Sequence, residues 1–269
     1  MWSFVNTGFV KNEDAVISIR DLSVQRGYGV FDFFRCVNGS PIFLDDHLER
    51  FFSSANELRL PVPLSKNEIK DVVVQLISRN NISGSGVRLT LTGGPSADAT
   101  NIGNPNLLIY EQKFAHPSPV QISSGIKLIT CPHQRQLPHV KSIDYLMATW
   151  LQPFIKQNGA DDVLYTNNGF VTECPRSNIF IVTQDNKIVT PNEKILKGIT
   201  RQKIIELAKK YFTVEERPVL FSEVSAAKEA FITSTTKKIL PVNCVDDVVF
   251  EMSDDNVSRQ LLKMMEGFT

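Results

Sequence analysis

The sequence has little cysteine and no excess of positive or negative charge. Its four cysteines, Cys36, Cys131, Cys174 and Cys244, show no paired spacing, which argues against a disulfide framework and a zinc site and fits a reducing cytoplasm. The 29 basic residues are matched by 29 acidic ones, so the chain lacks the positive field that binding to a nucleic-acid backbone requires. We therefore expect no metal and no nucleic acid among its partners.

Long apolar runs are also absent. No stretch approaches the roughly 20 apolar residues of a membrane-spanning helix, and residues 1–6 lack the basic region and apolar run of a secretion signal. The hydrophobic fraction of 42% and the charged fraction of 22% are nevertheless close to those of ordinary globular proteins. The sequence therefore predicts an ordered cytoplasmic protein outside the membrane.

Several common catalytic signatures are missing. The chain contains no Gly-x-Ser-x-Gly turn, no Gly-x-x-x-x-Gly-Lys phosphate loop and no His-Glu-x-x-His helix. We expect the paired Asp161 and Asp162 to form a solvated turn. The histidines lack ligand spacing, so we expect structural roles for His47, His116, His133 and His139.

Hydrophobic periodicity predicts two helices in the first third of the chain. The first begins at Asp46, with Glu49 three residues later as in a capping box. Its buried stripe comprises Leu48, Phe51, Phe52, Ala55 and Leu58. Its solvated face comprises His47, Arg50, Ser54 and Glu57. The second helix covers residues 66–79.

A Pro-containing segment, residues 113–120, predicts a linker between two domains. Before it, strands at 87–92 and 107–110 flank a loop rich in glycine, proline, asparagine and serine. After it the pattern predicts strands at 126–130, 163–165, 170–172, 179–182 and 230–233, and helices at 143–157, 200–211 and 256–265. Strands and helices are interspersed without regular βαβ alternation, which predicts two α+β domains, 1–115 and 120–269, with a cleft between them.

Six segments, taken together and in order, carry a resemblance. They are residues 26–32 (RGYGVFD), 47–51 (HLERF), 138–146 (PHVKSIDYL), 171–178 (VTECPRSN), 196–201 (LKGITR) and 234–242 (STTKKILPV). They resemble the motifs of fold-type IV pyridoxal 5'-phosphate enzymes, the group of D-amino acid transaminases, branched-chain aminotransferases and aminodeoxychorismate lyases. One such match is weak, but six in family order are specific.

The resemblance implies a two-domain fold-type IV structure, with the cofactor pyridoxal 5'-phosphate in the interdomain cleft and Lys141 in the C-terminal domain. A lysine amine can join the cofactor aldehyde covalently and then shuttle a proton, and by resemblance that lysine is Lys141. The cofactor ring accepts electrons when its nitrogen is protonated, and a carboxylate stabilises that cation. By resemblance, Glu173 supplies the carboxylate.

The cofactor phosphate needs N–H and O–H donors, which a helix N-terminus provides. Ile199 and Thr200 begin an apolar-periodic segment and so occupy such a position. By resemblance Thr236 is a second phosphate contact and Arg50 adds a charged one, while Thr235 faces the cofactor or the substrate.

The sequence departs from the family at the site that holds a substrate carboxylate. Many members carry an Arg-Gly pair where this chain has Gly93-Gly94, so the usual arginine is absent. Arg135 and Arg176 are two candidate replacements. Phe31 stands where D-amino acid transaminases tend to have tyrosine and branched-chain enzymes often have phenylalanine, so it leaves the handedness of the substrate open.

Three functions remain after this comparison. The Ser-Thr-Thr turn is most similar to that of the D-amino acid group, which favours a transaminase that moves an amino group between an amino acid, of branched-chain or D-amino acid type, and a 2-keto acid. The alternatives are an aminodeoxychorismate lyase, which forms 4-aminobenzoate and pyruvate, and a catalytically silent homologue that binds the cofactor. The resemblance also implies a homodimer in which loops of the neighbouring subunit close the pocket.

Overall fold

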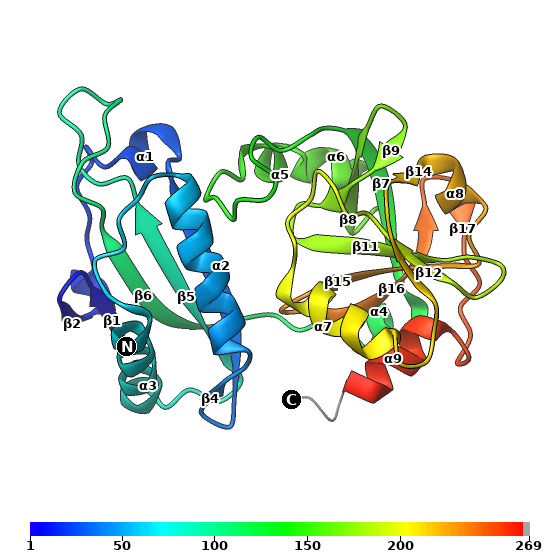
Figure 1. Cartoon of the computed structure of the whole chain (residues 1–269), viewed down its shortest axis with the longest axis horizontal. Coiled ribbons are helices and arrows are strands. Elements are labelled where there is room, and N and C mark those ends of the chain that lie inside the picture. The colour runs from blue at the N-terminus through cyan, green and yellow to red at the C-terminus, as the bar shows by residue number, and fades with distance from the viewer. Residues whose placement is uncertain (266–269) are drawn as a thin grey trace. The chain divides into compact units, whose positions relative to one another are not determined.

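The computed structural model describes residues 1–265, which divide into two compact units (Figure 1). Unit 1 contains Met1–Ala115 and Val140–Asp144, and unit 2 contains His116–His139 and the described residues from Tyr145 onward. Each unit combines a sheet with helices. The prediction of two α+β domains is therefore confirmed as to fold class.

Unit 1 is built on one antiparallel sheet with the strand order β2-β1-β6-β5-β3-β4. Its strands are β1 (Trp2–Val5), β2 (Gly8–Lys11), β3 (Gly29–Val37), β4 (Ser40–Pro41), β5 (Ser85–Thr92) and β6 (Leu107–Lys113). Its helices are η1 (Asn12–Asp14), α1 (Leu22–Arg26), α2 (Leu44–Glu57) and α3 (Lys66–Asn80). Side chains alternate across the sheet, and the face with Val30, Phe34 and Leu89 forms one core with α2 and α3.

Helix α2 has the predicted stripe but a different start. Leu48, Phe51, Ala55 and Leu58 are buried, and Phe52 is partly buried. The helix begins at Leu44, after Phe43 in the left-handed conformation and without a side-chain cap, so the predicted capping box at Asp46 is wrong. The capping box of this unit lies at α3, where Ser65 and Glu68 bond to each other's backbone N–H.

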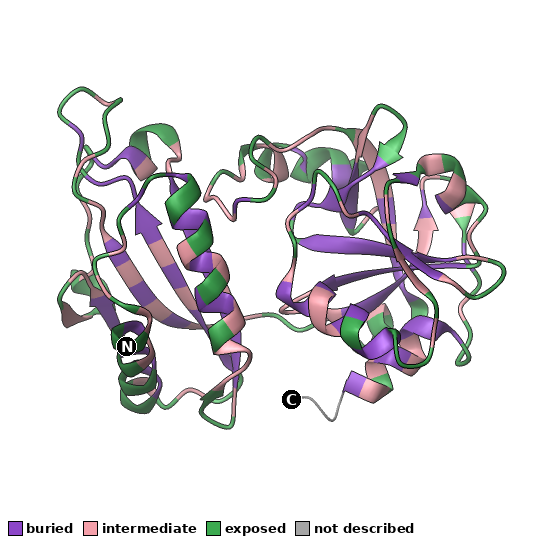
Figure 2. Ribbon diagram, in the orientation of Figure 1, coloured by how far each residue is buried: buried purple, intermediate pink, exposed green. Residues whose placement is uncertain are grey.

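Two residues assigned to the solvated face of α2 are buried instead. His47 is 1% exposed and Ser54 is 2% exposed. Periodicity placed them outside because their side chains are polar, but His47 bonds to the buried Asp32 and Ser54 accepts the N–H of Lys141, which offsets their desolvation. The alternation of buried and exposed turns along α2 is visible in Figure 2.

Unit 2 is built on an eleven-stranded mixed sheet. Along the main path its strand order is β13-β12-β11-β15-β16-β7-β8-β9-β14, with β10 pairing with β11 and β17 with β16. The strands are β7 (Ile126–Pro132), β8 (Asp162–Asn167), β9 (Phe170–Val171), β10 (Glu173–Cys174), β11 (Ser177–Val182), β12 (Ile188–Thr190), β13 (Val214–Glu216), β14 (Val219–Leu220), β15 (Glu229–Ser234), β16 (Lys238–Val245) and β17 (Val248–Val249). The helices are α4 (Pro119–Ser124), α5 (Leu146–Trp150), α6 (Gln152–Gln157), α7 (Ile199–Ala208), α8 (Phe221–Ser225) and α9 (Val257–Met265).

Both faces of the central strands of unit 2 are covered. In β11, Phe180 and Val182 pack with α7 and α9, whereas Ile179 and Ile181 join the cluster that contains α8. All six residues of β11 are consequently buried. The turn between β8 and β9 is formed by Asn168 and Gly169, both with positive φ, as is typical of an asparagine-glycine hairpin turn.

The structure corrects two sequence predictions in unit 2. The predicted helix 143–157 is two short helices, α5 and α6, separated at Leu151. Pro153 has no N–H and cannot continue the ladder of the preceding turn. Asp162 is buried rather than solvated, because it opens β8 and forms an ion pair of 3.1 Å with Lys237.

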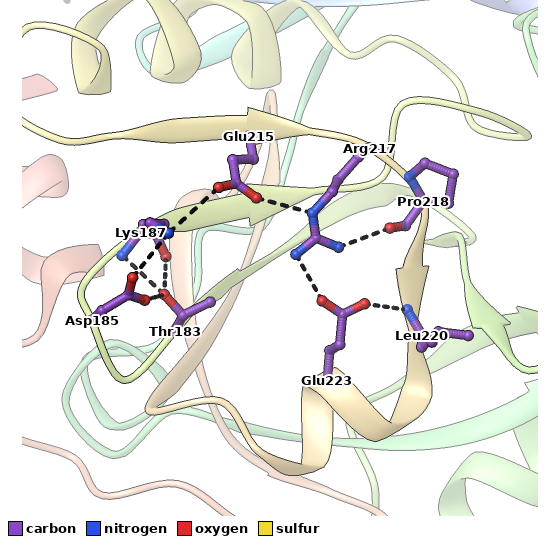
Figure 3. Close-up of polar contacts among 8 residues, drawn as sticks. All are labelled: Thr183, Asp185, Lys187, Glu215, Arg217, Pro218, Leu220 and Glu223. Carbon is purple, nitrogen blue, oxygen red and sulfur yellow. Dashed lines mark hydrogen bonds and ion pairs between the residues drawn. The ribbon is translucent and has the colours of Figure 1, made fainter.

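A polar network joins the β11–β12 turn to the segment around β14 (Figure 3). Arg217 bonds through Nε to Glu215 at 3.0 Å and through Nη2 to Glu223 at 2.7 Å, and Glu223 in turn accepts the backbone N–H of Leu220. Lys187 pairs with Asp185 at 3.0 Å. These charges are about one-third exposed or more, so solvent screening leaves each pair worth only about 0–1 kcal/mol.

The segment around Lys141 belongs to unit 1, whereas the sequence prediction placed it in the C-terminal domain. The backbone N–H of Phe31 donates to the carbonyl of Lys141, that of Ile143 donates to Gly29, and Ser142 bridges to Val30. Val140 is fully buried in the unit 1 core. Sequence position suggested the other domain because 140–144 lies beyond the linker, but the chain returns to pair with the start of β3.

Candidate active site

Lys141 is held at its backbone and lies beside an aromatic ring. Its N–H donates to the Ser54 hydroxyl at 3.1 Å, and its carbonyl accepts the N–H of Phe31 at 3.0 Å. Its amine, Nζ, lies 4.5 Å from the centre of the Phe31 ring. The buried Ser54 and the first residues of β3 therefore hold the backbone of Lys141, and its amine lies against the Phe31 ring.

Arg88 lies against the same ring and was missed by the sequence analysis. Its guanidinium carbon is 3.9 Å from the centre of the Phe31 ring. Thr90 is opposite Phe31 in the β3–β5 register, and Arg88 is the next residue along β5 on that face. Among residues 1–265 the Arg88 guanidinium has neither a hydrogen bond nor an ion pair. Arg88 is the one charged residue of β5, and this was the signal that could have identified it.

Arg50 is held by a buried carboxylate. Asp32, which is fully buried, accepts Arg50 Nε at Oδ2 and Arg50 Nη2 at Oδ1, both at 2.8 Å. His47 Nδ1 lies 2.7 Å from Asp32 Oδ1. Burial alone raises the pKa of Asp32, but Arg50 and His47 outweigh it and hold that pKa well below its usual value. Burial lowers the pKa of His47 despite Asp32, so the imidazole is neutral near pH 7 and donates Nδ1–H.

In unit 2 both carboxylate oxygens of Glu173 have partners. Oε1 accepts from Arg135 Nη1 at 3.0 Å, and Oε2 accepts the backbone N–H of Leu196 at 2.9 Å. Glu173 is only 4% exposed. Arg135 also donates to the carbonyl of Pro138, so this arginine is committed to the Glu173 carboxylate. Arg176, the other candidate for a substrate carboxylate, is exposed.

The N-terminus of α7 lies directly after the segment that contacts Glu173. The helix begins at Ile199 after Gly198, which makes no side-chain cap. Its first-turn N–H groups are therefore left for a ligand or water. Ile199 and Thr200 are both buried. Arg201, which is 2% exposed, bonds to the carbonyl of Pro191 and to Glu216, so its role in the motif is structural.

The predicted threonine pair forms the turn between β15 and β16. Thr235 and Thr236 are half-buried there. Lys237, the next residue, ties the turn to the rest of the sheet, because its amine contacts Asp162 at 3.1 Å and the Ser177 hydroxyl at 3.4 Å. The buried Thr233 hydroxyl at the end of β15 has no hydrogen-bond partner in the part of the chain that the structure describes.

The site residues expected from the sequence thus fall into two groups. Phe31, Arg50 and Lys141 lie in unit 1, while Arg135, Glu173, Ile199, Thr200, Thr235 and Thr236 lie in unit 2. Within residues 1–265 no cluster of three or more histidine, cysteine or acidic side chains is arranged to hold a metal. No helix in the same range is long and apolar enough to cross a membrane.

Comparison with known proteins identifies the family. Residues 29–245 match the family model described as amino-transferase class IV. The chain belongs to the class IV aminotransferases. The match covers 217 of 269 residues (29 to 245 inclusive) and includes all the motifs except the start of the first, residues 26–28, and it establishes the enzyme class that they predicted.

Relatives with named activities cover nearly the whole chain. A protein of Methanocaldococcus jannaschii, provisionally named a branched-chain-amino-acid aminotransferase, is 33% identical over 98% of this chain and 94% of its own length. A D-alanine aminotransferase of Listeria monocytogenes is 30% identical over 91% of this chain and 87% of its own. The similarity of this aminotransferase to both relatives therefore runs along nearly the whole chain and is not confined to one motif.

Solved structures share the fold. The branched-chain amino acid aminotransferase of Escherichia coli has a TM-score of 0.91 at 23% identity, covering 99% of this chain and 93% of its own. A protein of Legionella pneumophila, provisionally named a 4-amino-4-deoxychorismate lyase, has a TM-score of 0.87 at 26% identity, covering 96% and 97%. The fold-type IV prediction is confirmed.

As a class IV aminotransferase the protein uses pyridoxal 5'-phosphate, as the motifs predicted, and its side chains fit that group. When bound, the cofactor supplies an aldehyde that reacts with amines and a ring that withdraws electrons. The chain offers an anchored amine at Lys141, a buried carboxylate at Glu173, and uncapped N–H donors at α7. The unpartnered Thr233 hydroxyl adds a buried polar atom in the same unit as Glu173 and α7.

Proposed function

We propose that this class IV aminotransferase moves an amino group between an amino acid of branched-chain or D-amino acid type and a 2-keto acid. The observation that carries the proposal is the amine of Lys141, anchored through its backbone and held 4.5 Å from the Phe31 ring. Relatives named for both substrate types, at 30–33% identity, support it.

Each predicted residue has one task. Lys141 Nζ would be the amine that holds the cofactor, and once free it would act as the general base and acid that takes the proton from the substrate Cα and gives it back. Glu173 stabilises positive charge at the ring nitrogen. The N–H groups at Ile199 and Thr200, together with Thr236 and Arg50, bind phosphate, while Thr235 faces the cofactor or the substrate.

Arg88 binds the substrate carboxylate in place of the arginine that is missing at Gly93. Arg135 is committed to Glu173, and Arg176 is exposed, which leaves neither well suited. Arg88 has no anionic partner among residues 1–265 and contacts the same ring as Lys141. A guanidinium can grip a carboxylate with two parallel hydrogen bonds, so an amino acid bound to Arg88 would present its amine end near Lys141.

A lyase is the second candidate, because the Legionella pneumophila protein named for that activity shares the fold at 26% identity. Both reactions begin with the same proton removal, and the products distinguish them. A lyase would form pyruvate and 4-aminobenzoate from aminodeoxychorismate without any keto acid.

The enzyme acts as a cytoplasmic homodimer in this proposal. Three large apolar side chains in one short segment of unit 1 are exposed, namely Val16 at 74%, Ile19 at 83% and Val24 at 60%. Isolated exposed apolar residues are common, but three in nine residues favour a surface that a second copy covers.

Lys141 should be required for both cofactor attachment and turnover. Purified protein should absorb visible light through its bound cofactor, and that absorption should change on adding an accepted amino acid and return with a keto acid. Borohydride reduction followed by digestion should label the peptide that contains Lys141. A screen of donors of both hands against several keto acids then defines the substrate.

Lys141→Ala should lose the label and all turnover, whereas Lys127→Ala, at a half-buried lysine that bonds to the carbonyl of Asn158, should keep both. Label on another lysine, or turnover by Lys141→Ala, would reject the assignment. Turnover without any keto acid would favour the lyase.

A further inference from the structure

Glu173 and Asn178 face each other across the β10–β11 hairpin and bind the same residue. They are direct partners in the strand register. Glu173 Oε2 accepts the N–H of Leu196 at 2.9 Å, while Asn178 Nδ2 donates to the carbonyl of Leu196 at 2.8 Å. Both backbone groups of Leu196, its N–H and its carbonyl, are therefore hydrogen-bonded, two residues before Gly198, the N-cap of α7.

The same asparagine also packs against Gly198. A Cβ added at Gly198 would lie 2.4 Å from Asn178 Oδ1, a distance that real Cβ contacts do not reach. The φ of Gly198 is −66°, which any residue can adopt. The glycine is thus required by the close approach of Asn178 and not by backbone conformation.

We propose that Asn178 is a positioning residue that fixes the N-terminus of α7 relative to the Glu173 carboxylate. The inference rests on the proposed function, in which these two features bind the phosphate and the ring nitrogen of one cofactor. Asn178 acts through Leu196 and Gly198. Because the segment before α7 is bonded to the hairpin that carries Glu173, Asn178 sets the spacing that a ligand with a ring cation and a phosphate must match.

The proposal predicts that loss of the Asn178 contacts with Leu196 and Gly198 lowers the affinity for the cofactor phosphate more than the affinity for the cofactor ring. Asn178→Ala removes one hydrogen bond and leaves the Leu196 carbonyl without its donor, so α7 can shift while the Glu173–Arg135 pair remains. A preorganised contact of this size is worth about tenfold in affinity. Pyridoxal, which lacks phosphate, gains nothing from α7 and should be affected much less.

The test measures dissociation constants of pyridoxal 5'-phosphate and of pyridoxal for the full-length protein freed of cofactor, by absorbance titration. In Asn178→Ala we expect the ratio of the two constants to shift by about tenfold against the phosphorylated ligand. The 31P resonance of bound phosphate should also move. Asn243→Ala is the matched control, because Asn243 makes a similar amide-to-carbonyl bond of 2.7 Å with Ser124 elsewhere in unit 2, and it should leave the ratio unchanged.

Gly198→Ala tests the same contact from the other side. Its Cβ meets Asn178 Oδ1 in the native protein, so the single variant should shift the ratio in the same direction. In the Asn178→Ala background the added methyl has room, and the two effects should be less than additive. Gly198→Ala provides this readout even where Asn178→Ala is too unstable to purify.

Three outcomes overturn the inference: an unchanged ratio in both variants, equal weakening of both ligands, or strict additivity of the two substitutions. Failure of the unmodified protein to bind pyridoxal 5'-phosphate instead contradicts the proposed function, which distinguishes the two claims.

Discussion

The function that we propose for Arg88 is indicated by its neighbours in the folded structure. In the sequence it is the one charged residue of the segment that forms β5. The β3–β5 register brings it to the Phe31 ring, which Lys141 also contacts. The role that we propose for it, binding the substrate carboxylate, was absent from the predictions made on the motifs, and it is supported by that placement and by the pairing of Arg135 with Glu173.

Arg88→Ala should raise the KM for the amino acid substrate by about 10-fold to 100-fold, the cost of one charged hydrogen-bonded contact. The affinity for pyridoxal 5'-phosphate should stay within about twofold of the native value, because this residue is assigned to the substrate. Steady-state kinetics and cofactor titration check the two quantities.

Arg79→Ala supplies the control for Arg88. Arg79 also stacks on an aromatic ring, lying 4.2 Å from the centre of Phe9, but it has no proposed substrate contact. It should leave KM unchanged. An equal rise of KM in both variants would mean that stacking in unit 1, and not carboxylate binding, explains the effect.

At the scale of elements, one buried ionic cluster joins strand β3 to helix α2. Asp32 on β3 accepts hydrogen bonds from His47 and Arg50 on α2. The position of the Arg50 guanidinium is therefore set by Asp32 on the strand. Since the pKa of Asp32 is lower in the folded protein than its ordinary value of 3.8, folding favours the ionised form.

Asp32→Asn should destabilise the protein at pH 7 by about 3 kcal/mol, because it leaves Arg50 without its buried counterion. The sign of the pH dependence follows from the depressed pKa. The contribution of Asp32 is complete above its unfolded pKa near 4 and is lost as the pH falls further. The difference in unfolding free energy between native protein and variant should shrink below pH 4, measured by urea titration at several pH values.

Asp45→Asn is the matched substitution on the same helix, since Asp45 pairs with Lys70 at an exposed position. Exposed pairs contribute about 1 kcal/mol or less, so its effect should be small at every pH. A stability difference for Asp32→Asn that is the same at pH 3 and pH 7 would contradict the ionic explanation.

At the scale of the whole molecule, the exposed apolar residues 16, 19 and 24 predict association of two chains of 30.2 kDa. Light scattering after size exclusion should give the mass of a dimer. Ile19→Glu should shift the protein toward monomer at micromolar concentration, because burying an unpaired carboxylate is costly. Val74→Glu, at an α3 residue that is 59% exposed, should not. A monomeric native protein would contradict the proposal.

The sequence alone determined the family, the cofactor and the helices and strands with strong periodicity. The six motifs named Lys141 and Glu173, and the stripe of α2 followed from Leu48, Phe51 and Ala55. These signals are local, since a helix period, a turn and a motif are each written in consecutive residues.

Only the tertiary structure decided which polar residues meet. It buried His47 and Ser54 on a face expected to be solvated, because Asp32 and the Lys141 N–H lie opposite them. It paired Arg135 with Glu173, returned residues 140–144 to unit 1, and brought Asn178 against Leu196 and Gly198. These contacts join residues 15 to 87 positions apart. No local pattern records them, because the partner of a buried polar group is chosen by packing and hydrogen-bond geometry after the chain has folded.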